Sequence, residues 1–264
     1  MSSATAGSAL AAAGAVGPYF AWDAWAGETG WRPFADLLDG DVAGSRVAGA
    51  RSTLVTTYRL SEDAVPVRVV ASITFLGIVS RLVSPPLGAA VAGGVLPLAG
   101  RDDLWWRPVP SGPLPVAYRG GQALPCGGLD ARTVAEALVR SAVAGPVSDL
   151  LAVFRDRFRL SPQVLWGNVA SALAGAAGVL AGADRPYAER AGAIVEHAFA
   201  QPPLAGTGTL VQPDPARARR FLVRRSCCLY YRIPGGGTCA DCVLTPGGRA
   251  AARGGGQAAV RELT

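Results

Sequence analysis

The sequence predicts a mainly α-helical single domain with a small antiparallel β-hairpin, an α+β variant of a helical body. Three observations predict this class. Half of the 264 residues are hydrophobic and only 17% are charged, which is enough apolar side chain for a substantial core. Apolar residues recur at helical spacing in several segments that follow helix-capping residues. Aromatic and β-branched residues flank a Pro/Ser/Gly turn, as in a hairpin.

The first part of the chain is expected to form helices around a proline-rich bend. Residues 1–14 are expected to be a flexible N-terminus, and a short helix is expected to follow this mobile lead-in within the first 20 residues. A helix is expected from about Val65 to Val83, where apolar residues recur near helical spacing, and Pro85-Pro86 is expected to end it because proline removes an intrahelical hydrogen bond. The hairpin is expected over residues 104–118, with its prolines keeping it at a sheet edge.

Four helices are expected after Gly128, each opened by a residue that caps helices or suits their first turn. They are expected to begin at Asp130, Gly145-Pro146, Ser161-Pro162 and Asp184, and the first is expected to reach about Val143. A short arginine-rich helix is expected over residues 216–225. Residues 246–264, rich in Gly, Ala and Arg, are expected to be disordered.

The positive charge is confined to the C-terminal end, and the chain contains no lysine. Residues 1–216 carry 16 Arg against 17 acidic residues, a net charge of −1. Residues 217–264 carry 9 Arg against 2 acidic residues, a net charge of +7. Without lysine the chain cannot supply a P-loop for nucleotide phosphates, and no DNA- or RNA-binding module accompanies the arginines.

The single histidine, His197, excludes metal sites that need two or more His ligands, and it is expected to pack on its own helix. The longest uncharged stretch, residues 160–183, is interrupted by polar residues and is expected to be a buried core helix rather than a membrane span. A secretory signal carries basic residues before its apolar part, and no basic residue precedes the apolar N-terminal stretch here. A soluble cytoplasmic protein is therefore expected.

Four of the five cysteines lie in one short segment with the spacing C-C-x₁₀-C-x₂-C. They are Cys227, Cys228, Cys239 and Cys242. Disulfides are disfavoured because a bond between adjacent cysteines is strained and a reducing compartment would not preserve it. Structural zinc usually takes two C-x₂₋₄-C knuckles, whereas one half here has no spacer. A [2Fe–2S] cluster fits best, since it takes four thiolates, two on each iron.

The cysteine run at the end of a helical body resembles the FhuF-type ferric-siderophore reductases. The segment from Leu160 to Ala170, LSPQVLWGNVA, is similar to the motif that precedes that family's Ala-rich helix. The resemblance covers roughly residues 15–245, with the cluster-binding segment at 226–243. It implies that Cys227, Cys228, Cys239 and Cys242 ligate a [2Fe–2S] cluster. It also implies an oxidoreductase that passes single electrons to iron(III) held by a siderophore, of the hydroxamate type, and releases iron(II).

A second interpretation is a non-enzymatic iron–sulfur or zinc module that senses redox state or binds a partner. Under the reductase interpretation, arginines near the cysteines dock an acidic electron donor such as a ferredoxin or flavodoxin, although they could equally form a solvated face. Candidate docking or substrate residues are Arg220, Arg224, Arg225, Trp105, Trp106, Trp166 and Asn168. Asn168 could also be a hydrogen-bonded interior amide, and the remaining thiol, Cys126, is expected to be a bystander.

Overall fold

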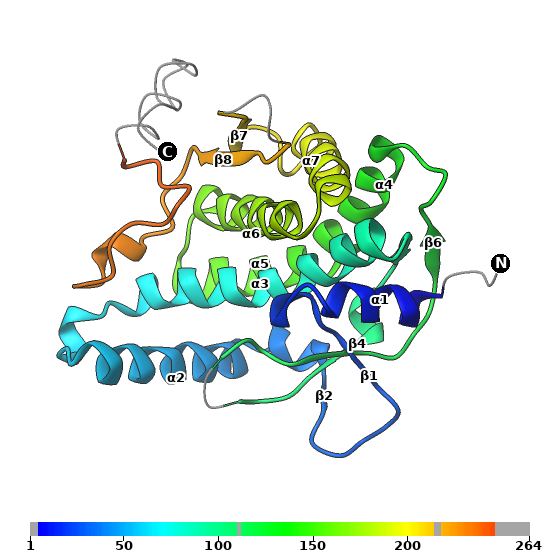
Figure 1. Cartoon of the computed structure of the whole chain (residues 1–264). Helices are drawn as coiled ribbons and strands as arrows, with labels where there is room; N and C mark the ends of the chain where they lie inside the picture. The colour runs from blue at the N-terminus through cyan, green and yellow to red at the C-terminus, as the bar shows by residue number, and fades with distance from the viewer. Residues whose placement is uncertain (1–4, 110–111, 214–217, 246–264) are drawn as a thin grey trace.

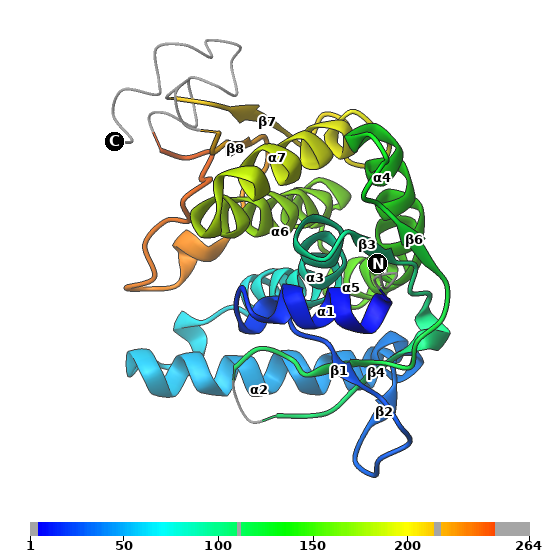
Figure 2. The same ribbon diagram turned by 45° about the vertical axis from the view of Figure 1, so that its right-hand side comes forward.

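One long buried helix, α3 (Val67–Ala92), runs through the centre of the protein (Figure 1). The computed structural model describes residues 5–109, 112–213 and 218–245. Around α3 pack α1 (Ala6–Gly14), α2 (Gly40–Tyr58), α5 (Ser148–Phe158), α6 (Pro162–Ala183) and α7 (Arg185–Phe199). Figure 2 shows α1 and α2 on one side of α3 and α6 and α7 on the other. Helix α4 (Ala131–Leu138) lies against α7.

Most of the predicted helix starts are confirmed. The side chain of Asp130 accepts a hydrogen bond from the backbone N–H of Thr133, and that of Ser161 accepts one from Val164. Helix α7 begins directly after Asp184, although the Asp184 side chain makes no capping bond. The predicted break at Gly145 is also present, because Gly145 has non-helical dihedral angles inside the π-helical stretch that joins α4 to α5.

The prediction that Pro85-Pro86 ends the central helix is wrong. Helix α3 continues through both prolines to Ala92. Proline at position 85 has no N–H for the carbonyl of Arg81, four residues earlier. That carbonyl instead accepts a 2.7 Å hydrogen bond from the indole N–H of Trp22, which is distant in sequence. A tertiary partner therefore satisfies the group that the proline leaves free.

Two further predictions about helices and termini are corrected. The short helix expected near the N-terminus is present as α1, but it begins at Ala6, inside the stretch expected to be flexible, and its Leu10 and Ala13 are buried. The arginine-rich helix over 216–225 is also wrong. Residues Phe221–Arg224 form strand β8, which pairs antiparallel with β7 (Gly208–Val211). The expected disordered tail, 246–264, lies outside the described residues.

The predicted hairpin is present as β4 (Leu104–Trp106) and β5 (Val116–Tyr118), which pair antiparallel. Its expected place at a sheet edge is wrong, because β1 (Asp23–Ala24) pairs with β5 and β2 (Arg32–Pro33) pairs with β4. Both outer strands are only two residues long, which is too short for a recognisable strand pattern in the sequence. Strands β3 (Val95–Pro97) and β6 (Ala123–Pro125) form a separate pair.

Three helical stretches are long and apolar enough to cross a membrane, judged by length and composition alone: α3, residues 131–158, and α6. In their most apolar windows, 61%, 56% and 50% of the residues are buried within the protein. Much of the apolar character of these helices therefore serves the protein's own interior.

The buried guanidinium of Arg81 joins α3 to the N-terminal segment and to the hairpin connection. It donates to the backbone carbonyls of Leu114 (2.8 Å), Pro18 (2.5 Å) and Ala21. We expect Arg81→Met to lower the free energy of unfolding by about 3 kcal/mol or more, because hydrogen bonds to charged groups contribute about 1.5–3 kcal/mol each. Urea denaturation measures this loss.

The matched control is Arg68→Met, on the same helix, where Arg68 is exposed. Its effect should stay within about 0.5 kcal/mol, as for most surface substitutions. Equal stability of the two variants would contradict the structural role assigned to Arg81.

Candidate metal centre

The four clustered cysteines lie in the segment that follows β8, beside the ends of α2, α3 and α6 (Figure 1). This segment is attached at three places. The hydroxyl of Ser72 on α3 donates to the backbone carbonyl of Cys228 (2.8 Å), and the hydroxyl of Tyr58 on α2 lies 3.2 Å from that of Tyr230. The backbone N–H of Arg224 donates to the carbonyl of Asp241 (3.4 Å). The first two contacts hold the arm with Cys227 and Cys228 against α3 and α2, and the third holds the arm with Cys239 and Cys242 against β8.

Tight turns bring the two cysteine pairs together. Leu229, Gly235 and Gly237 have positive φ angles of 72°, 79° and 74°, so the chain reverses between Cys228 and Cys239. The sulfurs of Cys228 and Cys239 then lie 3.5 Å apart, well beyond the roughly 2.05 Å of a disulfide bond. The proline–glycine run from Pro234 to Gly237 therefore forms part of a tight turn between the two cysteine pairs.

Backbone N–H groups point at the sulfurs of the other two cysteines. The N–H of Leu229 donates to Cys227 Sγ (3.3 Å), and that of Leu244 donates to Cys242 Sγ (3.4 Å). Such N–H···S bonds stabilise thiolates and are among the interactions that tune iron–sulfur clusters. Each arm therefore presents one sulfur to the other arm and one sulfur to a backbone donor.

The thiols differ in their readiness to ionise. The hydrogen bond between the two sulfurs lowers the pKa of Cys228 to about 6 and raises that of Cys239. Burial raises the pKa of Cys227. The contact between the two sulfurs thus favours the thiolate form of Cys228, which is the form that binds metals.

A chain of buried polar side chains lies behind the cysteine segment. The side-chain amide nitrogen of Asn168 donates to both the carbonyl (2.9 Å) and the hydroxyl (3.0 Å) of Ser72. The Asn168 amide oxygen accepts from Arg224 Nη2 (2.7 Å). All three residues are buried. Asn168 is therefore a hydrogen-bonded interior amide that connects α3, α6 and β8.

Gly167 allows β8 to approach α6 this closely. A Cβ atom at this position would lie 2.0 Å from the Ser226 hydroxyl and 3.0 Å from Arg224 Nη2. The first contact would require the Ser226 side chain to turn away, and the second would require the buried Arg224 guanidinium to shift by a few tenths of an ångström. The Trp166-Gly167-Asn168 motif thus holds the strand that leads into Cys227.

Several buried polar atoms beside the cysteines have no hydrogen-bond partner in the structure. They are Nε and Nη1 of Arg224, the hydroxyl of Ser226 and Oδ2 of Asp241. Buried donors are normally satisfied, so unused donors next to thiolates suit a negatively charged, acceptor-rich group. The donor set of this segment therefore fits an iron–sulfur cluster.

Within the described residues, no group of three or more His, Cys, Asp or Glu side chains is arranged to hold one metal ion. The facing pair, Cys228 and Cys239, is flanked by two single thiols. A two-iron cluster takes its thiolates in pairs over a wider object than one ion. Cys126 is remote from this segment; it is buried between β6 and α4, and its thiol donates to the carbonyl of Leu124 (3.1 Å).

The residues predicted to dock substrate or partner lie on three different elements. On β4, Trp105 stacks on Trp25 with ring centroids 3.9 Å apart, and Trp106 is buried. On α6, Trp166 packs against the core beside Asn168. Near β8, Arg220 pairs with Glu196, Arg224 is buried, and Arg225 is exposed. The structure thus brings Asn168 and Arg224 together, and their docking roles remain predictions.

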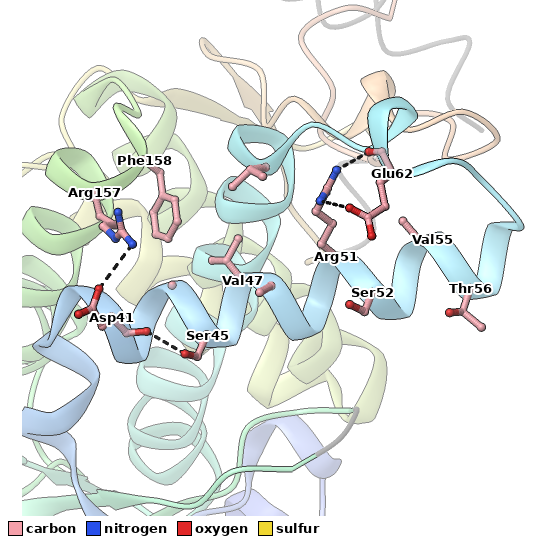
Figure 3. Close-up of a pocket in the computed structure, with 13 residues that line it drawn as sticks. Asp41, Ser45, Val47, Arg51, Ser52, Val55, Thr56, Glu62, Arg157 and Phe158 are labelled. Carbon is pink, nitrogen blue, oxygen red and sulfur yellow. Dashed lines mark hydrogen bonds and ion pairs between the residues drawn. The ribbon is translucent and has the colours of Figure 1, made fainter.

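A groove along α2 was not predicted from the sequence. It encloses about 860 Å³ between α2, the start of α3 and the end of α5 (Figure 3). Its charged side chains pair with one another: Arg51 binds Glu62 (2.9 Å), and Arg157 binds Asp41 (3.5 Å). No cysteine lines this groove. It is therefore a separate feature from the cysteine segment.

Comparison with known proteins identifies the cysteine segment. Residues 224–244 match the family model of the FhuF 2Fe-2S C-terminal domain, and they include all four clustered cysteines. The match supports an FhuF-type assignment and points to a [2Fe–2S] cluster as the cofactor. No curated protein and no solved structure matches the chain.

Proposed function

We propose that this chain, with its FhuF-type 2Fe-2S segment, is a cytoplasmic siderophore-iron reductase. Cys227, Cys228, Cys239 and Cys242 would hold the [2Fe–2S] cluster. The observation that carries the proposal is the 3.5 Å approach of the Cys228 and Cys239 sulfurs within the matched segment, with backbone donors on Cys227 and Cys242. When bound, the cluster supplies one electron at a time.

The reaction follows from ligand hardness. Hydroxamate oxygens are hard donors that hold hard iron(III) far more tightly than the softer iron(II). Adding one electron to the chelated iron(III) gives iron(II), its bonds to oxygen weaken, and the freed hydroxamates take up protons. This reaction requires no general acid or base from the protein. The work of the chain is to hold the cysteines near the surface and to set their electrostatic surroundings.

The test is a single-turnover reduction under anaerobic conditions. The cluster-loaded full chain is reduced with dithionite, freed of excess reductant and mixed with a ferric trihydroxamate chelate. We expect one iron(II), trapped by a coloured iron(II) chelator, for each cluster that is reoxidised. A reduced protein that stays reduced with the chelate, yet reoxidises with oxygen, would instead indicate a redox sensor.

We further propose that the electron donor is an acidic protein such as a ferredoxin or flavodoxin. Residues 218–245 carry five arginines against one carboxylate, and Arg219, Arg225 and Arg232 are exposed. Clustered exposed charge steers oppositely charged partners, and salt screens the steering. The cysteine segment therefore offers a positive surface directly beside the proposed cluster.

The expected result is an electron-transfer rate from an acidic ferredoxin that falls by about tenfold between low and high ionic strength. Replacing both Arg225 and Arg232 with glutamine should lower the low-salt rate and flatten this dependence. Arg140→Gln, an exposed arginine just after α4, serves as the control and should change neither. Stopped-flow measurements decide, and a rate insensitive to salt in the wild type would contradict the docking proposal.

A further inference from the structure

Arg224 is a buried cation whose hydrogen bonds are only partly used. Its side chain is 1% exposed, at the end of β8 and three residues before Cys227. Only Nη2 is satisfied, by Asn168, while Nε and Nη1 have no partner. A guanidinium stays protonated in proteins, so this positive charge persists inside the structure. Buried charges are normally paired, and the nearest carboxylate is therefore informative.

That carboxylate belongs to Asp241, on the other arm of the cysteine segment. Its Oδ2 lies 3.8 Å from Arg224 Nε, longer than a hydrogen bond, and it has no hydrogen-bond partner either. Asp241 sits between Cys239 and Cys242, whereas Arg224 precedes Cys227. The two opposite charges thus lie on the two arms that carry the cysteines.

Asn168 fixes the position of the guanidinium. Both N–H bonds of its amide are directed to Ser72, so its oxygen has to face Arg224. Ser72 in turn donates to the carbonyl of Cys228. The network therefore ties Arg224 to the same backbone that carries Cys228, and the charge cannot move away from the cysteines without breaking it.

We propose that Arg224 and Asp241 set the reduction potential of the centre in opposite directions, with Asn168 as the positioning residue of Arg224. The inference rests on the proposed cluster. Reduction adds negative charge, so the Arg224 cation and its two unused N–H groups favour the reduced state and raise the potential. The Asp241 carboxylate disfavours the reduced state and lowers the potential.

The experiment is a redox titration of the cluster-loaded full chain, followed by visible absorption and by electron paramagnetic resonance. Arg224→Gln should shift the reduced-to-oxidised ratio at a fixed applied potential about tenfold toward oxidised, which is about 59 mV for one electron. Asp241→Asn should shift the ratio toward reduced. Arg225→Gln, at the exposed neighbouring arginine, should change it by less than about threefold, because solvent screens its charge.

Opposite shifts cannot arise from general loosening of the segment, which would move both variants the same way. Equal-sign shifts, or no shift in either variant, would overturn the inference. If Arg224→Gln loses its cluster, two other variants decide the same question. Arg224→Lys keeps the positive charge and should leave the reduced-to-oxidised ratio nearly unchanged, whereas Asp241→Asn should still shift the ratio toward reduced. Reduction of the ferric chelate is a separate readout. Shifted potentials without chelate reduction would support the inference and contradict the reductase function. Chelate reduction with unshifted potentials would contradict the inference and support the reductase function.

Discussion

Replacing Cys228 with serine is expected to yield a colourless protein whose iron content falls at least about tenfold. Loss of a mere outer-sphere partner already costs about 10–100-fold in metal affinity, and Cys228 is proposed as a direct ligand. Its sulfur is buried, faces Cys239 at 3.5 Å, and has a pKa lowered to about 6 by that contact. A serine hydroxyl offers neither the softness nor the ionisation of this thiolate. Iron, labile sulfide and visible absorption measure the outcome.

The control is Cys126→Ser. Cys126 is as deeply buried as Cys228 but lies between β6 and α4, and its thiol donates to a backbone carbonyl that a serine hydroxyl can also reach. This variant should keep its iron and its colour. Retention of iron in Cys228→Ser, or its loss in Cys126→Ser, would contradict the assignment of the ligands.

Gly167→Ala is expected to lower both the stability of the protein and its retention of iron. The added methyl group would meet the Ser226 hydroxyl at 2.0 Å and Arg224 Nη2 at 3.0 Å, so the Ser226 side chain has to turn and the buried Arg224 guanidinium has to shift. Overpacking of this kind costs about 1–3 kcal/mol. The shift disturbs the hydrogen bond between Arg224 and Asn168, three residues before Cys227. We expect a lower free energy of unfolding and a protein that loses iron during purification.

Gly175→Ala on the same helix is the matched control. A Cβ atom there meets nothing within 4 Å, so the substitution should add about 0.5–1 kcal/mol through better helix propensity. Denaturant unfolding of the two metal-free variants, with iron content measured in parallel, compares them. Gly167→Ala as stable and as iron-rich as Gly175→Ala would show that β8 does not depend on this close approach.

Local signals predicted most of the helices. Asp130 and Ser161 cap helices where the sequence places them, because capping depends on residues only three positions apart. The failures involve distant partners. Pro85 stays inside α3 because Trp22 takes the freed carbonyl, and residues 221–224 form a strand because β7 pairs with them. Neither partner is visible from a local window of sequence.

The candidate site divides in the same way. The cysteine positions and the turn between them follow from spacing and from the glycines. The support behind them does not, since Asn168 bonds Ser72 across 96 residues and Arg224 across 56 residues. The remaining clue in the sequence was an arginine that directly follows Phe221-Leu-Val in an apolar run. The pairing of β8 with β7 places this arginine in the interior.

Metal and sulfide analysis of the anaerobically purified full chain decides whether the four cysteines hold a [2Fe–2S] cluster. We expect a red-brown protein with two irons and two labile sulfides per chain, reducible by one electron. A colourless protein that carries one zinc ion and no sulfide would contradict it.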